Sequence, residues 1–107
     1  MENIGFLDNI YIAQGMEKVD LVKLKKELDE KPLFATVFVI TISSNEQDQL
    51  DIYHSKYLMQ RYYKKNPPFV VGIAKNKGDA YTLVEKIVQE CMTLRGDVNL
   101  KAFLIGE

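Results

Sequence analysis

Two stretches of the chain place apolar and charged residues at helical spacing. In DLVKLKKELDEKP, three leucines recur every three or four positions between Asp20 and Pro32, with charged residues between them. Aspartate is a favoured N-cap residue, and proline inside a helix breaks it. The pattern predicts a helix over residues 20–30.

The second helical stretch is longer and has a broader apolar face. It begins at Asp79, an N-cap residue type, and ends at Arg95 and Gly96, where glycine suits the left-handed residue just past a helix. Its apolar positions are Ala80, Leu83, Val84, Ile87, Val88, Cys91, Met92 and Leu94. We expect a helix over residues 79–95 that packs one face against a sheet.

Two other segments are apolar at almost every position and rich in β-branched and aromatic residues. They are LFATVFVITIS, over residues 33–43, and FVVGIA, over residues 69–74. Strands of this composition are buried on both faces, in the middle of a sheet that helices cover. A third apolar segment, NLKAFLI, predicts a strand over residues 99–105. The order strand, helix, strand over 69–105 then predicts a right-handed parallel crossover.

Two regions leave alternatives open. The segment LDIYH, residues 50–54, can fold back as the second strand of a hairpin, with Ser55 capping a short helix over 56–65. Alternatively, one long helix runs from 44 to 65. The hairpin is favoured because LDIYH has good strand propensity and serine interrupts the helical pattern. Residues 1–15 predict either a short strand around NIYIA or an N-terminal arm.

Together these elements predict one α/β, or α+β, domain over residues 1–107. Its sheet is expected to be mixed and largely parallel, with three or four strands and helices packed on it. The length of 107 residues suits one compact domain, and 47% apolar and 27% charged residues are ordinary for a globular protein. No apolar run approaches the roughly 20 residues that span a bilayer, and the N-terminus does not resemble a signal peptide. We therefore expect a cytoplasmic protein that does not bind membranes.

Charge is distributed unevenly along the chain. The net charge is −1, yet the stretch 52–78 contains six bases and no acid. Within it, the sequence HSKYLMQRYYKKNPP interleaves tyrosines with cations. On a helix over 56–65, Leu58, Met59 and Tyr62 are expected to face inward while the cations face water.

Few residues suggest catalysis or metal binding. His54 is the sole histidine, and we expect it to lie half-exposed at a strand end. Cys91 is the sole cysteine and lies on the apolar face of a predicted helix, so we expect it in the core. No spacing typical of a zinc or calcium site is present. The sequence predicts no catalytic residue, no metal and no cofactor.

The most suggestive chemistry is the sequence GIAKNKGDAY, where a buried strand turns into a helix N-terminus. Backbone amides and the helix dipole at such a junction favour an anion, and lysines add positive charge. The same amides are occupied if Asp79 caps the helix. The candidate anion-binding residues are Arg61, Lys64, Lys65, Lys75, Asn76, Lys77 and Gly78.

These features favour a non-enzymatic interaction or regulatory module. Its partner is expected to be another protein or a second copy of the chain, whose acidic N-terminal half would face the basic stretch. The alternative is a binder of a phosphorylated small ligand or of nucleic acid through the basic 56–78 region, since interleaved tyrosines and cations also suit single strands.

Overall fold

The two most apolar strands lie side by side at the centre of a four-stranded sheet. The computed structural model describes residues 4–44 and 47–106. Strand β2 (Phe38–Ile42) pairs antiparallel with β4 (Phe69–Ala74), and Phe38 lies opposite Ala74. Val39, Ile40, Val70 and Ile73 are completely buried. The central placement predicted for the two segments is confirmed.

The outer strands come from the N-terminus and from the hairpin. Strand β1 (Gly5–Ile12) pairs parallel with β4, and β3 (Leu50–His54) pairs antiparallel with β2, so the strand order is β1-β4-β2-β3. The favoured hairpin is thus confirmed. The expected α/β domain with a mixed four-stranded sheet is confirmed. The sheet is not largely parallel as predicted, because two of its three strand pairings are antiparallel.

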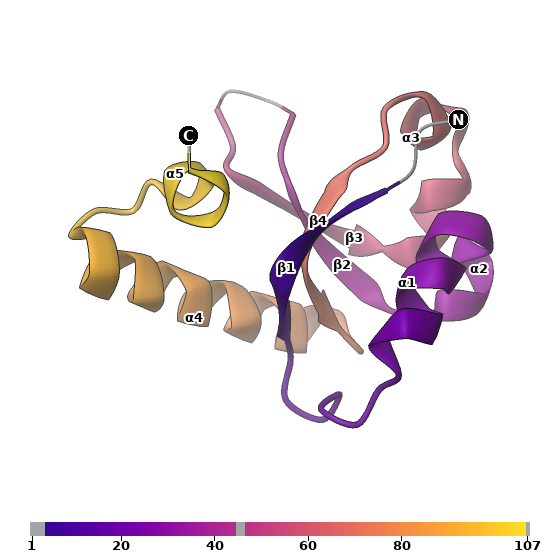
Figure 1. Cartoon of the computed structure of the whole chain (residues 1–107), viewed down its shortest axis with the longest axis horizontal. Helices are drawn as coiled ribbons and strands as arrows, with labels where there is room; N and C mark the ends of the chain where they lie inside the picture. The colour runs from indigo at the N-terminus through magenta and orange to yellow at the C-terminus, as the bar shows by residue number, and fades with distance from the viewer. Residues whose placement is uncertain (1–3, 45–46, 107) are drawn as a thin grey trace.

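Helices cover both faces of this sheet (Figure 1). One face carries α1 (Leu21–Glu30), α2 (Pro32–Ala35), the 3-10 helix η1 (Ser55–Met59) and α3 (Arg61–Lys65). The other face carries α4 (Lys77–Arg95), against which α5 (Leu100–Ile105) packs. The two faces therefore have separate cores, with alternate residues of β2 contributing to each.

The middle of the sheet is irregular on both sides of Val71. The stretch 7–10 of β1 faces this single residue of β4, and the register between β4 and β2 shifts at the same point. The neighbouring Gly72 allows close packing, because a Cβ there would lie 3.2 Å from the side chains of both Ile40 and Leu83. The absence of a side chain at Gly72 thus lets Leu83 of α4 pack closely on the sheet.

The predicted strand over 99–105 is wrong, because Leu100–Ile105 forms helix α5. The Asn99 side chain accepts a hydrogen bond from the Ala102 amide at 3.1 Å, and Gly106 ends the helix in the left-handed conformation. Leu100, Phe103 and Leu104 pack together with α4, at a helical spacing that a short apolar run hides. The predicted parallel crossover over 69–105 is therefore also wrong, because it required this strand. The parallel pair is instead β1 with β4.

The predicted strand over 33–43 begins later than expected. Pro32–Ala35 forms the short helix α2, and the backbone turns into β2 through Thr36, which has a left-handed φ of 46°.

The helix predicted over 56–65 is divided at Gln60 into η1 and α3. Two caps also differ: His54 rather than Ser55 caps η1, and Asn76 rather than Asp79 caps α4. The cap at Asp20 and the left-handed Gly96 are confirmed.

Thr36→Gly should stabilise the fold. A β-branched residue in the left-handed region costs about 1 kcal/mol that glycine avoids. Thr36 is exposed, so its side chain contributes little packing. Urea denaturation should give a higher free energy of unfolding, by up to about 1 kcal/mol. Thr36→Val, which keeps the branch, should give no increase; equal effects of glycine and valine would contradict strain at this position.

Tyr11 connects the outer strand β1 to α4. Its hydroxyl donates a hydrogen bond to Glu90 Oε1 at 2.7 Å. Burial, together with this bond to a carboxylate, raises the pKa of Tyr11 to about 12. A tyrosine with a raised pKa keeps its proton in the folded state while the unfolded chain loses it from about pH 10 upward. The stability from this bond is therefore complete below pH 10 and is lost as the pH rises toward 12.

Tyr11→Phe should lower the free energy of unfolding at pH 8 by about 1 kcal/mol, the usual net value of such a bond. It should also make the loss of stability between pH 10 and 12 shallower than in the wild type. Chemical denaturation across this pH range measures both effects. Tyr81→Phe, on the exposed side of α4, is the matched control at pH 8 and should have no effect. An unchanged pH slope in Tyr11→Phe would contradict the prediction.

Candidate functional site

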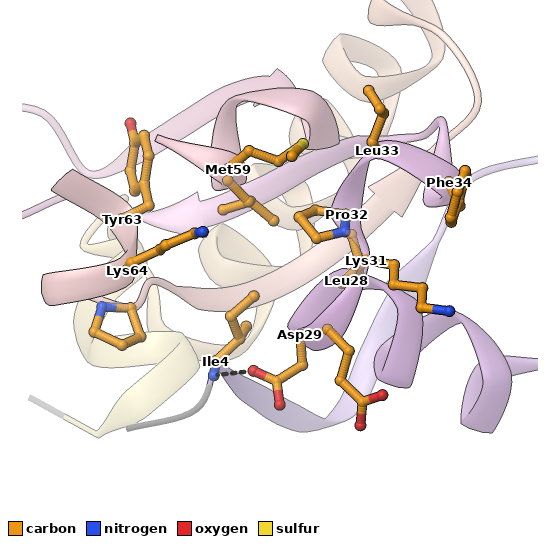
Figure 2. Close-up of a pocket in the computed structure, with 13 residues that line it drawn as sticks. Ile4, Leu28, Asp29, Lys31, Pro32, Leu33, Phe34, Met59, Tyr63 and Lys64 are labelled. Carbon is orange, nitrogen blue, oxygen red and sulfur yellow. Dashed lines mark hydrogen bonds between the residues drawn. The ribbon is translucent and has the colours of Figure 1, made fainter. Parts of the chain in front are cut away.

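An apolar groove lies between α1–α2 on one side and η1–α3 on the other (Figure 2). Its volume is about 690 Å³, and residues 4 and 67 also line it. The floor is part of the core: Leu28, Pro32 and Leu58 are buried. The groove therefore opens directly onto the packed interior of this face of the sheet.

The rim of the groove exposes large apolar side chains. Leu33 is 52% exposed, Phe34 is 65% exposed and Met59 is 47% exposed. Figure 2 shows Leu33 and Phe34 on α2 at one side of the groove, with Met59 and Tyr63 on the other. Single exposed apolar residues are normal, but a group of them around a hollow is typical of an interaction surface.

Helix α2 determines how Leu33 and Phe34 are presented. Pro32 occupies the first turn, where its missing N–H costs nothing, and Pro32 and Ala35 face the core. In so short a helix, the two residues between them must then face outward. The Lys31 ammonium group lies 6.0 Å from the centre of the Phe34 ring, in a cation–π arrangement.

A tyrosine cluster supports the opposite wall. The rings of Tyr53 on β3 and Tyr63 on α3 stack 5.1 Å apart, and Tyr62 meets Tyr63 edge-on at 5.1 Å. Burial raises the pKa of both Tyr53 and Tyr63 above the ordinary tyrosine value. These contacts hold the short helix α3 against the sheet, although α3 has no fully buried residue of its own.

The two walls carry net charges of opposite sign: Asp29, Glu30 and Lys31 line the α1–α2 wall, and Lys64 lines the η1–α3 wall. Helix α1 ends with Glu27, Asp29 and Glu30 and has no basic residue in its last turn, so these acids lie at the negative end of the helix dipole. The Asp29 carboxylate accepts a hydrogen bond from the Ile4 amide at 3.0 Å, whereas Glu30 is exposed. On the other wall, Lys64 extends from α3 into the groove (Figure 2). Among described residues, neither Glu30 nor Lys64 forms an ion pair.

The structure places the candidate anion-binding residues in two separate groups. Arg61, Lys64 and Lys65 lie on α3, which precedes β4, and residues 75–78 follow β4 at its other end (Figure 1). A strand of six residues is roughly 20 Å long. The cations therefore do not form one continuous patch, and Lys64 is the one of these candidate residues that lines the groove.

In the second group, the backbone amides at the N-terminus of α4 are already capped by a side chain of the protein. The Asn76 side chain accepts a hydrogen bond from the Asp79 amide at 2.7 Å and donates one to the Asp79 carboxylate at 3.2 Å. Lys75 lies beside the turn at Gly15, and its Nζ is 3.1 Å from the position that a Cβ on Gly15 would occupy. Lys77 and Gly78 are exposed in the first turn of α4. An incoming anion would meet the Asp79 carboxylate at this position.

His54 and Cys91 both have structural contacts. His54 Nδ1 accepts a hydrogen bond from the Lys56 amide at 3.0 Å, and the ring meets Phe38 edge-on at 5.2 Å. The Cys91 thiol is fully buried, as expected, and donates to the Asp97 carbonyl oxygen at 3.2 Å. Burial raises the pKa of this thiol. Among described residues, no group of His, Cys, Asp and Glu side chains is placed to hold a metal ion.

Sequence reasoning missed most of the groove. It assigned Leu33 and Phe34 to a buried strand, and it turned Met59 and Tyr62 inward, whereas of the three residues expected to face inward only Leu58 is buried. The available signal was Pro32, a favoured first residue of a helix, followed by residues that can form one turn.

No known protein family matches the chain, and no curated protein or solved structure matches it either. In the described ranges, no helix is both long and apolar enough to cross a membrane. The function is therefore inferred from the groove.

His54→Ala should weaken the wall formed by η1. Loss of an N-cap typically costs about 1 kcal/mol of stability. His54→Asn keeps a side-chain acceptor at the cap and should recover about half of this loss, because the ring contact with Phe38 is still missing. Urea denaturation at pH 8 measures both values. If asparagine is no better than alanine, the hydrogen bond to Lys56 does not stabilise η1.

Proposed function

We propose that this chain is a non-enzymatic protein-interaction module that binds an apolar segment of a protein partner in the groove. The observation that carries the proposal is the exposure of Leu33, Phe34 and Met59 around a floor of buried residues. Covering such side chains gains about 25 cal/mol for each Å² of apolar surface removed from water. A partner with its own apolar side chains provides that cover.

The types of residue on the rim also support a protein partner. Aromatic residues and methionine are enriched at the centre of protein interfaces, and charged residues surround such centres. The groove has this arrangement, with Phe34, Met59 and Tyr63 around the hollow and Glu30 and Lys64 at its walls. Methionine adapts its shape to different neighbours, which suits a binding surface.

Binding of nucleic acid or a phosphorylated ligand has less support. A single-strand site needs a continuous cationic track beside its stacking residues. The cations of the 56–78 region are divided between the two ends of β4. We further propose that the module acts in the cytoplasm, where a buried, unpaired thiol such as Cys91 stays reduced.

Site-specific photo-cross-linking tests the proposed function. A photoreactive residue replaces Phe34 or Met59 in the full chain, which is expressed in its native cells. The protein segment that becomes cross-linked is identified and then synthesised as a peptide. Both positions should cross-link to apolar segments of a protein partner. The same residue at Leu94, which is 72% exposed on α4, is the control and should not.

The synthetic peptide should then bind the purified protein in a titration. Phe34→Asp should weaken this binding at least about tenfold, because it removes a central aromatic contact and adds a buried charge. Leu94→Asp should leave the affinity unchanged. Absence of a protein adduct at both groove positions, or binding that is insensitive to Phe34→Asp, would refute the proposed function.

A further inference from the structure

We propose that the occupant of the groove is a second copy of this chain, related to the first by a two-fold axis that runs along the groove. This inference rests on the proposed function and names its partner. Two features of the groove carry it: its walls have opposite charges, and its apolar side chains lie on both walls. A surface of this kind is complementary to itself.

The charges of α1 call for a cationic partner. Its last turn has acids and no base, and these acids outnumber the one cation at the C-cap, Lys31, so the helix end keeps a net negative charge. Glu30 is exposed there and forms no ion pair with a described residue. A cation brought to this position would offset the unfavourable interaction of these acids with the negative end of the helix dipole.

Helix α3 supplies that cation from the same chain. Its last turn holds Lys64 and Lys65, which suit the negative end of their own helix, and the surrounding stretch 52–78 has no acid. Lys64 lines the groove and is unpaired among described residues. Within the described part of the chain, an acid without an ion-pair partner thus lies on one wall and a base without one lies on the other.

A two-fold axis along the groove brings these charges together. Such an axis exchanges the walls, so the α1–α2 wall of one copy faces the η1–α3 wall of its partner. Each Glu30 then approaches the partner's Lys64, and the contact occurs twice. The same rotation sets Leu33 and Phe34 against the partner's Met59, so apolar surface meets apolar surface.

The symmetry also favours a second copy over an unrelated peptide. An unrelated segment would need a base facing α1, an acid facing α3 and apolar residues between them. A second copy has this pattern in the required order. The sequence predicted that the acidic N-terminal half of one copy faces the basic stretch of another. In the proposed dimer this contact is made by Glu30 and Lys64.

Charge reversal tests the inference. Lys64→Glu and Glu30→Lys each create two like-charge contacts in a homodimer, and a mixture of the two variants restores both opposite-charge contacts. Sedimentation equilibrium at tens of micromolar should show a dimer for the wild type and at least about tenfold weaker association for each variant alone. The equimolar mixture should recover the wild-type association, and native mass spectrometry should show a one-to-one heterodimer.

Two controls separate charge pairing from folding effects. Lys86→Glu reverses an exposed lysine on α4 and should leave the association unchanged. The double variant K64E/E30K carries both reversals in one chain and should dimerise like the wild type. Since Glu30 and Lys64 are both exposed, circular dichroism should show a native fold for every variant.

Three results would overturn the inference: a monomeric wild type at tens of micromolar, a dimer unaffected by either reversal, or a mixture that associates no better than its components. If the wild type is monomeric while a cross-linked peptide from another protein still binds in a Phe34-dependent way, the second copy is excluded and the proposed function stands. If neither a dimer nor a Phe34-dependent peptide is found, both proposals fail.

Discussion

Antiparallel pairing of β2 with β4 is the constraint on which the rest of the structure depends. Because both strands bury both faces, each face of the sheet needs its own helical cover. On one face a single long helix, α4, supplies most of that cover. On the other face the cover is divided among four short helices. The groove is the hollow left between the pair α1–α2 and the pair η1–α3, which meet each other at α2 and η1.

The groove exists because local backbone preferences override a run of apolar residues. Pro32 starts a helical turn, and Thr36 reverses the chain into β2, so Leu33 and Phe34 leave the sheet and face outward. A strand continuing through these positions would bury them instead. The exposed α2 side of the rim is thus a consequence of a few residues at the junction of α1 with β2.

Much of the fold follows from the sequence where several signals agree. At α1 and α4, helical spacing, capping residues and a terminal proline or glycine all indicate the same boundaries within a few residues. Where the only signal is a short apolar run, as in 33–37 and 99–105, strand and helix cannot be distinguished, because packing decides between them. The groove was unpredictable for a related reason: its residues lie on elements far apart in the sequence, and only Lys64 was recognisable from charge alone.

The irregular stretch 7–10 of β1 has a consequence for aggregation. A smooth outer strand is a template on which further chains can be added by backbone hydrogen bonds without limit. Here the free side of the sheet at β1 is broken opposite Val71 and displays the polar side chains of Asp8 and Asn9. Fibril growth from this border is thereby discouraged.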